Sequence, residues 1–254
     1  MDMIKNNTEN NVENKAEKDI KNKAEHKNKI KNKVEIENKD SIITKNIKCS
    51  LCMANALPFK TFKVKKYYLC QNCGAVLLGH DYYLSAEAEK ARYLAHQNNV
   101  NDAGYQKFVA PIVNAVKAGF GCADKGLDFG CGPGPVISKL LKDEDYDIRL
   151  YDPLFCNDAE ALCSVYDYIV CCEVIEHFAK PAEEFNKLRS LLKDGGKLFC
   201  MTYIYDSSID FDNWHYKNDT THIIFYSIKT LEWIKSNFNF SRIKIDGRLI
   251  ELMV

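Results

Sequence analysis

The sequence lacks long apolar runs, an excess of charge of either sign, and an apolar segment near its start. No stretch of the 254 residues approaches the roughly 20 consecutive apolar residues of a membrane-spanning helix, so we expect no membrane span. Lys and Arg number 35, as do Asp and Glu, so no overall basic charge indicates a nucleic-acid partner. The first residues are rich in Asn, Lys and Glu instead of the apolar core of a signal peptide, and we expect a cytoplasmic protein.

Composition divides the chain into four regions. Residues 1–46 form a Lys/Asn/Glu-rich tail with few large apolar side chains, which we expect to be disordered; a weak helix and a nucleic-acid arm are the alternatives. Residues 47–84 are a small module with paired cysteines, and residues 85–104 are predicted to be a helical lid or linker that begins at the helix cap Ser85. The remaining residues, 105–254, are long enough for one good core.

Eleven cysteines, an odd number, are scattered through the chain, which indicates a reduced, intracellular protein. Four of them form two pairs, Cys49-x-x-Cys52 and Cys70-x-x-Cys73, with seventeen residues between the pairs. This spacing is typical of a zinc ribbon whose four thiolates hold a structural Zn²⁺. Four free core cysteines and a redox pair are the alternatives.

Strands and helices alternate after residue 105. This order predicts an α/β fold, a Rossmann-like, doubly wound, mostly parallel sheet with an antiparallel C-terminal hairpin, plus the small N-terminal zinc ribbon. The predicted strands are 127–129, 148–151, 168–172, 197–203, 243–245 and 249–254. The predicted helices contain Phe108–Val116, Val136–Leu141, Pro181–Leu192 (stopped by Asp194-Gly195-Gly196), and Ile228–Phe238, whose apolar face includes Ile228.

The stretch Gly126–Pro135 carries the most specific pattern in the chain. A buried strand runs into a turn with glycines at alternate positions, Gly130-x-Gly132-x-Gly134. Because glycine has no Cβ, a ligand can approach the backbone closely there. The G-x-G-x-G spacing differs from the G-x-G-x-x-G of dinucleotide folds, and it favours S-adenosylmethionine over NAD.

Four segments in correct order resemble the class I S-adenosylmethionine-dependent methyltransferases: 127–134, 150–153, 166–178 and 191–196. The likeness covers about residues 105–254, and Glu173–Phe178 is most similar to the methylases of quinone biosynthesis and their uncharacterised bacterial relatives. The terminal hairpin also fits the edge strands of that family.

The resemblance implies roles for individual residues. Asp128 and the three glycines, Gly130, Gly132 and Gly134, would line the methionine and ribose of the cofactor, with Cys172 and Glu173 beside its methyl-bearing sulfur. Asp152 would accept hydrogen bonds from the ribose hydroxyls, and a turn or cap role before Pro153 is its alternative. Only thirteen residues, Pro153–Val165, precede the central strand, so we expect the third strand of the family to be truncated or missing. Asp158 is the nearest candidate for the adenine contact.

Two polar and aromatic segments are predicted to hold the rest of the site. In the lid, Tyr93 and Asn98 are candidate contacts to the cofactor, with His96, Asn99 and Tyr105 beside them; ordinary helix surface is the alternative. The second segment, Trp214–Tyr226, is a long connection whose aromatics and histidines predict an acceptor pocket, with plain aromatic packing as the alternative. The candidate general bases are His177, His215 and His222.

The resemblance therefore implies an enzyme that moves a methyl group from S-adenosyl-L-methionine to oxygen or carbon of a small-molecule acceptor by in-line displacement. The main alternative is an RNA or protein methyltransferase that docks its substrate on the zinc ribbon. A non-catalytic cofactor-binding protein and an NAD-dependent enzyme are further alternatives. No feature of the sequence predicts an oligomeric state.

Overall fold

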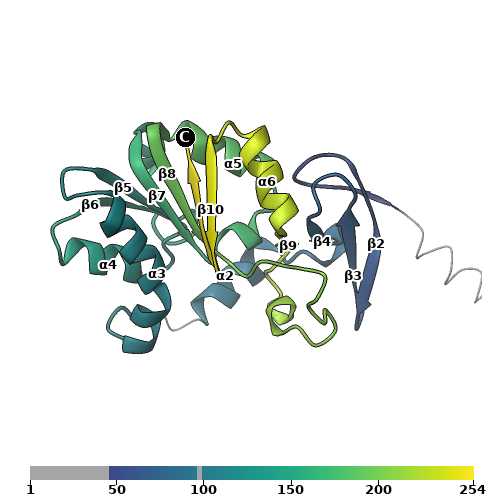
Figure 1. The fold of residues 1–254 in the computed structure, drawn as a ribbon. Helices are drawn as coiled ribbons and strands as arrows, with labels where there is room; N and C mark the ends of the chain where they lie inside the picture. The colour runs from purple at the N-terminus through teal and green to yellow at the C-terminus, as the bar shows by residue number, and fades with distance from the viewer. Residues whose placement is uncertain (1–45, 96–98) are drawn as a thin grey trace, which may run out of the picture. The chain divides into compact units, whose positions relative to one another are not determined.

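The structure is a computed structural model that describes residues 46–95 and 99–254. The predicted tail, apart from residue 46, and the candidate lid residues His96 and Asn98 lie outside the described residues. The described chain contains two sheets flanked by helices (Figure 1). Among these residues, no helix is both long and apolar enough to cross a membrane.

A six-stranded sheet forms the centre of the larger part, with the order β10-β11-β8-β7-β5-β6. Strands β6, β5, β7 and β8 run parallel, whereas β11 is antiparallel to β8 and to β10. The predicted parallel sheet with an antiparallel C-terminal hairpin is thus confirmed. The strand bounds are β5 (Lys125–Phe129), β6 (Asp147–Tyr151), β7 (Tyr166–Cys172), β8 (Leu192–Met201), β10 (Arg242–Asp246) and β11 (Leu249–Met253).

Helices cover both faces of this sheet, because the strand side chains alternate between two apolar layers. On one face, Tyr168 and Val170 pack with α3 (Ala103–Gly119) and α4 (Val136–Lys142). On the other, Ile169 packs in the core that includes α5 (Pro181–Ser190) and α6 (Ile228–Asn237). The result is the doubly wound arrangement predicted from the sequence (Figure 1).

The sheet ends at β6, as the short spacing after Asp152 predicts. Between β6 and β7 the described chain forms one bridge, between Asp152 and Cys156, and a 3₁₀ helix, η2 (Ala159–Cys163), but no strand. The described chain thus has no strand between β6 and β7, in line with the expectation of a truncated or missing strand there.

Two details of the helix predictions are wrong. Helix α5 ends at Ser190, and Leu192 already pairs with Tyr166 of β7, because the Asp194-Gly195-Gly196 stretch is absorbed as an irregularity within β8. Gly195 takes a left-handed φ of 77° there. In α6, Ile228 is 48% exposed and does not belong to the buried face, whereas the cap Ser227 forms a capping box with Thr230.

The cysteine-rich module is a second sheet, with the order β1-β2-β3-β4-β9. Its first four strands are β1 (Ile47–Lys48), β2 (Asn55–Phe62), β3 (Lys65–Cys70) and β4 (Val76–Leu78). The fifth, β9 (Ile224–Phe225), comes from the long connection after β8 and pairs with β4, Val76 opposite Phe225. The sheet thus extends beyond residues 47–84.

Short helical segments complete the fold. Helix α2 (Ala86–Leu94) begins at Ser85, whose side chain accepts a hydrogen bond from the backbone N–H of Ala88, as predicted. The 3₁₀ helices are η1 (His80–Tyr82), η3 (Ile175–His177) after β7, and η4 (His215–Asn218) in the long connection. Helices η3 and η4 place charged and aromatic side chains beside the end of the central strand.

Candidate functional site

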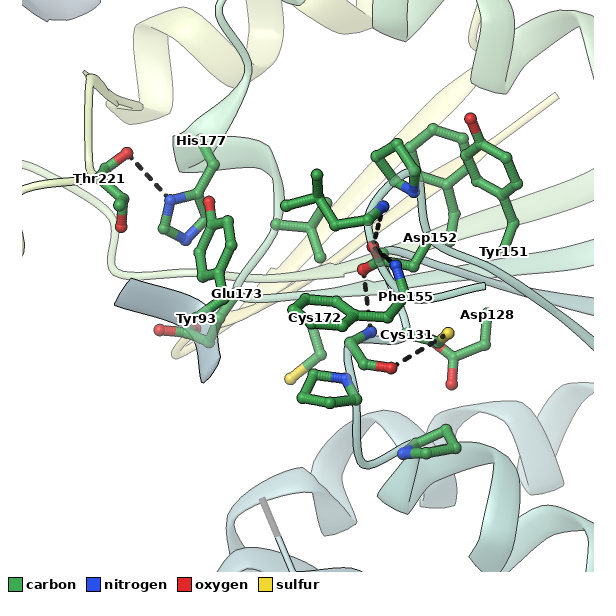
Figure 2. A pocket seen from close by; sticks show the side chains of 18 of the residues that line it. Tyr93, Asp128, Cys131, Tyr151, Asp152, Phe155, Cys172, Glu173, His177 and Thr221 are labelled. Atoms are coloured by element: carbon green, nitrogen blue, oxygen red, sulfur yellow. Dashed lines mark hydrogen bonds between the residues drawn. The ribbon is translucent and has the colours of Figure 1, made fainter. Parts of the chain in front are cut away.

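A cavity of about 650 Å³ lies at the carboxyl ends of β5, β6 and β7, where open α/β sheets bind ligands (Figure 2). Each strand contributes residues at its carboxyl end: 130–135 follow β5, 152–155 follow β6, and Cys172 ends β7 and is followed by 173–174. Helix α2 and the long connection supply the remaining wall. The predicted site residues that line the cavity are Tyr93, Asp128, Gly130, Gly132, Gly134, Asp152, Cys172, Glu173, His177 and His222.

The glycine turn is fixed against the end of β6. The backbone N–H of Gly130 donates a hydrogen bond of 2.7 Å to the carbonyl of Tyr151, and that of Gly132 donates one of 3.0 Å to Oδ2 of Asp152. Gly130 has a left-handed φ of 80°, and a Cβ on it would lie 2.6 Å from a methyl group of Val174. Both facts require glycine at this position.

Asp152 has the turn role considered for it and also faces the cavity. Its Oδ1 accepts hydrogen bonds from the backbone N–H groups of Leu154 at 2.8 Å and Phe155 at 3.1 Å, which is a turn-forming role. The same carboxylate also lines the cavity. Asp158, the candidate adenine contact, instead caps η2 through the N–H of Glu160 and is not part of the cavity wall.

Leu154 and Phe155 are site residues that the sequence analysis missed. Both line the cavity beyond Asp152, where they add an apolar wall suited to a flat ring. The signal available in the sequence was their position directly after the Asp152-Pro153 turn, at the carboxyl edge of the sheet.

Asp128 is a buried acid on the floor of the cavity. It is 4% exposed, and its Oδ2 accepts a hydrogen bond of 2.7 Å from the Ser138 hydroxyl. Burial raises its pKa to about 6, although the bond from Ser138 opposes this shift. Burial also raises the pKa of the neighbouring Cys172 thiol, so that thiol is protonated at neutral pH.

Two carboxylates, Glu173 and Glu176, share the hydroxyl of Tyr216. Tyr216 Oη lies 3.2 Å from Oε2 of Glu173 and in close contact with Oε1 of Glu176, while Arg248 forms an ion pair with Oε1 of Glu173. Burial raises the pKa of each carboxyl to about 7. Glu173 has a left-handed φ of 53°, the kind of backbone strain that gathers at functional sites.

Glu176 and Arg248 had no role in the sequence analysis, and Tyr216 entered it only as one of the aromatics of Trp214–Tyr226. Tyr216 lies on η4, and Arg248 lies in the turn of the C-terminal hairpin, where its guanidinium carbon is 4.0 Å from the centre of the Tyr203 ring. Both come from positions distant in sequence from Glu173, which is why local patterns gave no signal for their contacts with it. Glu176 had one signal, its place in the Glu173–Phe178 segment.

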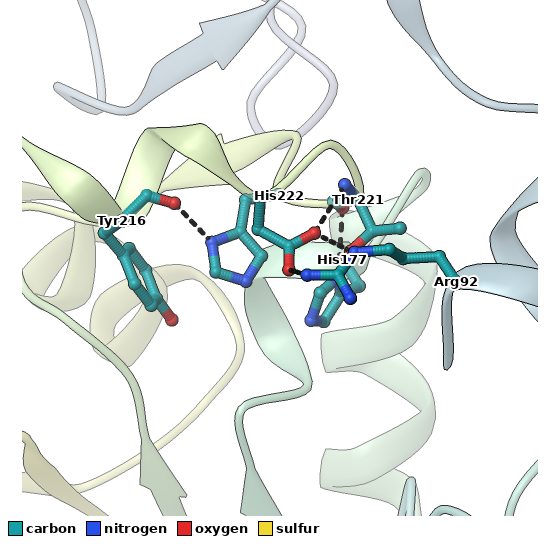
Figure 3. Close-up of polar contacts among 6 residues, drawn as sticks. Arg92, His177, Tyr216, Thr221 and His222 are labelled. Atoms are coloured by element: carbon teal, nitrogen blue, oxygen red, sulfur yellow. Dashed lines mark hydrogen bonds and ion pairs between the residues drawn. The ribbon is translucent and has the colours of Figure 1, made fainter. Parts of the chain in front are cut away.

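His177 and His222 lie together at one side of the cavity, with ring centroids 4.8 Å apart. Nδ1 of His177 lies 2.9 Å from the carbonyl of Thr221, and Nδ1 of His222 lies 2.8 Å from the carbonyl of Tyr216 (Figures 2 and 3). Since a carbonyl only accepts, both rings donate from Nδ1. His215, the third candidate base, is exposed and packs against Tyr203 outside the cavity wall.

Helix α2 contacts the long connection across one wall of the cavity. Arg92 forms a 2.7 Å ion pair with Asp219 (Figure 3), and the Tyr93 ring packs edge-on against His177 (Figure 2). Glu89, Tyr93 and Tyr105 line the cavity, so the described part of the predicted lid lies where a lid would act.

One part of the long connection packs in an aromatic core, and another part lines the cavity. Trp214 and Phe225 pack in an aromatic core with Tyr67 of the cysteine-rich sheet, which corresponds to the packing alternative. Asp219, Thr221 and His222 line the cavity, which corresponds to the alternative of an acceptor pocket. The same segment therefore ties the cysteine-rich sheet to the cavity wall.

The four paired cysteines form one cluster in which the sulfur atoms all lie within 4.8 Å of one another. Cys49 and Cys73 sulfurs are 3.7 Å apart, and those of Cys52 and Cys70 are 3.3 Å apart. Four thiolates at Zn–S distances of about 2.3 Å place neighbouring sulfurs about 3.8 Å apart, so the cluster can hold a metal ion after small adjustments. A hydrogen bond from Cys73 lowers the pKa of Cys49 to about 5.

A family profile described as a methyltransferase domain matches residues 85–245. The chain belongs to this family. The methyltransferase domain thus includes the glycine turn, the carboxylate pair and both cavity histidines. No curated protein sequence matches the chain.

Solved structures similar to this methyltransferase domain include an O-methyltransferase family protein from Burkholderia thailandensis, 15% identical with a TM-score of 0.45. That match covers 65% of this chain and 61% of the other, so this chain spans less than two thirds of its length. The 1,6-didemethyltoxoflavin-N1-methyltransferase of the same organism, solved with its namesake ligand and S-adenosylhomocysteine, is 10% identical; the match covers 77% of this chain and 96% of that one, with a TM-score of 0.47.

Proposed function

We propose that this protein is an S-adenosyl-L-methionine-dependent methyltransferase that acts on a small-molecule acceptor. The observation that carries the proposal is the single cavity that joins the Gly130–Pro135 turn and Asp152 to Glu173 and the two histidines. Its volume of about 650 Å³ suits a cofactor together with a small acceptor.

The residues of the cavity fit the proposed cofactor. Glycine N–H groups and the Asp152 carboxylate provide polar contacts for a ribose, and Leu154 and Phe155 provide an apolar surface for an adenine. Asp128 supplies a buried negative charge for a positively charged methionyl group. S-adenosylmethionine would supply an already activated methyl group, so the chain must align the acceptor and take up its proton.

Glu173 is our proposed proton acceptor. It is the carboxylate of the pair that lines the cavity, and a pKa near 7 suits transfer of a proton at neutral pH. Its oxygens are oriented by Arg248 and Tyr216. The histidine bases expected from the sequence are less suited, since burial lowers the pKa of both His177 and His222.

We further propose that the four-cysteine cluster binds a structural Zn²⁺. Four cysteine ligands close the coordination sphere, so the ion would stabilise the sheet and would not touch an acceptor. Cys70 ends β3, and Cys73 lies in the turn between β3 and β4. Because β4 pairs with β9, the ion would also support the connection that carries His222.

Calorimetry with S-adenosylmethionine and with NAD tests the cofactor. We expect binding of S-adenosylmethionine alone, and binding of NAD alone would contradict the proposal. Transfer of label from methyl-labelled cofactor into a fractionated lysate then tests the acceptor. Label in small metabolites supports the proposal, whereas label in RNA or protein would favour the alternative.

The proton-acceptor role is tested by Glu173→Gln once the acceptor is known. We expect turnover to fall by about a hundredfold or more, while the dissociation constant of the cofactor stays within a few-fold. His215→Gln is the matched control, because that residue is exposed and lies outside the cavity wall. Unchanged turnover in Glu173→Gln would remove this role from Glu173.

A further inference from the structure

We propose that Glu176, His177 and His222 bind a divalent transition-metal ion at the wall of the cavity. One ligand atom from each of the three residues lies within 4.8 Å of the others. Ligands that converge on one ion at about 2.0–2.2 Å lie about 3–3.6 Å from their neighbours, so the three side chains would close on the ion after small adjustments. The site is separate from the four-cysteine cluster and shares no residue with it.

The two histidines are oriented as metal ligands usually are. Each donates its Nδ1 hydrogen to a backbone carbonyl, which fixes both the ring and the tautomer (Figure 3). In this tautomer Nε2 of each ring carries the lone pair that a metal ion would accept. Both side chains line the cavity, so an ion held by them is accessible from it.

Glu176 provides an independent observation that points to a ligand. Its side chain is fully buried, and Oε1 is occupied by the Tyr216 hydroxyl. Its other oxygen, Oε2, is buried without a hydrogen-bond partner in the described structure. An unpartnered buried carboxylate oxygen is costly, and a cation would remove that cost.

The charges around Glu176, His177 and His222 also favour a cation. The acidic groups near it are Glu173, Glu176, Asp219 and Glu89, whereas the nearby cations are Arg248 and Arg92. Arg248 is paired with Glu173 and Arg92 with Asp219, so neither forms an ion pair with Glu176.

The ligand set indicates the kind of ion and its role. Two imidazoles and one carboxylate suit Mn²⁺, Fe²⁺, Co²⁺ or Zn²⁺, and three protein ligands leave positions for water or an acceptor oxygen. Figure 2 shows His177 on the side of the cavity away from Asp128, which is the side we assign to the acceptor. An ion there would lower the pKa of an acceptor hydroxyl bound to it.

Titration of the full-length protein with Mn²⁺, followed by the electron paramagnetic resonance signal of free Mn²⁺, tests the site. We expect one Mn²⁺ to bind per chain, and His222→Gln to weaken binding at least about tenfold. His215→Gln is the matched control and should bind as the wild type does. No Mn²⁺ bound by the wild type, or equal binding by His222→Gln, would overturn the proposal.

A second measurement needs no variant. In the NMR spectrum of the wild-type protein, Mn²⁺ should broaden the imidazole signals of His177 and His222 far more than those of His80 and His215. Broadening of all four alike would contradict the site. Neither readout depends on S-adenosylmethionine, so failure of the cofactor proposal and failure of the metal proposal are distinguishable.

Discussion

Gly132 and Asp152 follow different strands, yet the backbone N–H of Gly132 donates a hydrogen bond of 3.0 Å to Oδ2 of Asp152. The other carboxylate oxygen holds the N–H groups of Leu154 and Phe155. One side chain therefore joins the two turns that form the proposed cofactor side of the cavity. The Asp152 carboxylate therefore holds both turns in place in the ligand-free protein.

Asp152→Asn should weaken S-adenosylmethionine binding about tenfold or more, because an amide supplies only one acceptor oxygen where the carboxylate uses two. Calorimetry measures the change. Asp158→Asn is the matched control, since Asp158 caps η2 away from the cavity, and it should bind the cofactor normally. Normal binding by Asp152→Asn together with weakened binding by Asp158→Asn would assign the ribose contact to Asp158.

Gly130→Ala should cost more stability than Gly195→Ala, although both glycines have a φ near 80°. Each substitution places a side chain in a left-handed conformation, at a cost of about 1 kcal/mol. Only the Cβ at residue 130 also meets Val174, at 2.6 Å, whereas nothing lies within 4 Å at residue 195. We expect a total of about 2–3 kcal/mol for Gly130→Ala in denaturant unfolding. Equal losses of stability in the two variants would show that the Val174 side chain moves aside without cost.

Asp128→Asn should stabilise the ligand-free protein, and more so at high pH. The folded-state pKa of Asp128 is raised from 3.8 to about 6, so its contribution to stability is lost as the pH rises through about 6. We expect the stability difference between Asp128→Asn and wild type to grow by about 1 kcal/mol between pH 5 and pH 8. Denaturant unfolding across this range measures it, and a difference independent of pH would contradict the raised pKa.

Removal of the proposed Zn²⁺ should loosen β4 and β9 together while β5 and β7 stay protected, because β9 pairs only with the cysteine-rich sheet among the described strands. Hydrogen exchange after treatment with a chelator measures this, and Cys73→Ser should reproduce it. Cys163→Ser, at an exposed cysteine outside the cluster, is the control. Unchanged hydrogen exchange in β9 would show that the metal site does not stabilise that strand.

Local sequence patterns were sufficient to predict the central sheet and the part of the site formed by the ends of its parallel strands. The glycine turn, Asp152 and the end of β7 are adjacent in space because carboxyl ends of parallel strands share one edge, so their positions follow from strand order. The end of α5 was placed too late, since Leu191 and Leu192 fit a helical stripe equally well until the pairing of Leu192 with Tyr166 is known. Periodicity carries no information about that pairing.

The other part of the site depends on contacts between distant segments. Arg248 reaches Glu173 from the C-terminal hairpin, and Tyr216 reaches both carboxylates from the long connection. The pairing of β9 with β4 joins residues almost 150 positions apart. No propensity or spacing within either segment specifies such a partner, so these contacts required the folded chain.

The boundary of the family match, at residue 85, falls between β4 and α2. A recombinant fragment that begins there would keep the whole six-stranded sheet but would leave β9 as an unpaired edge and uncover the aromatic core around Trp214. Such a fragment would fold around its central sheet and yet lose the register of the segment that carries His222. Biochemical experiments on this protein therefore have to include the cysteine-rich sheet.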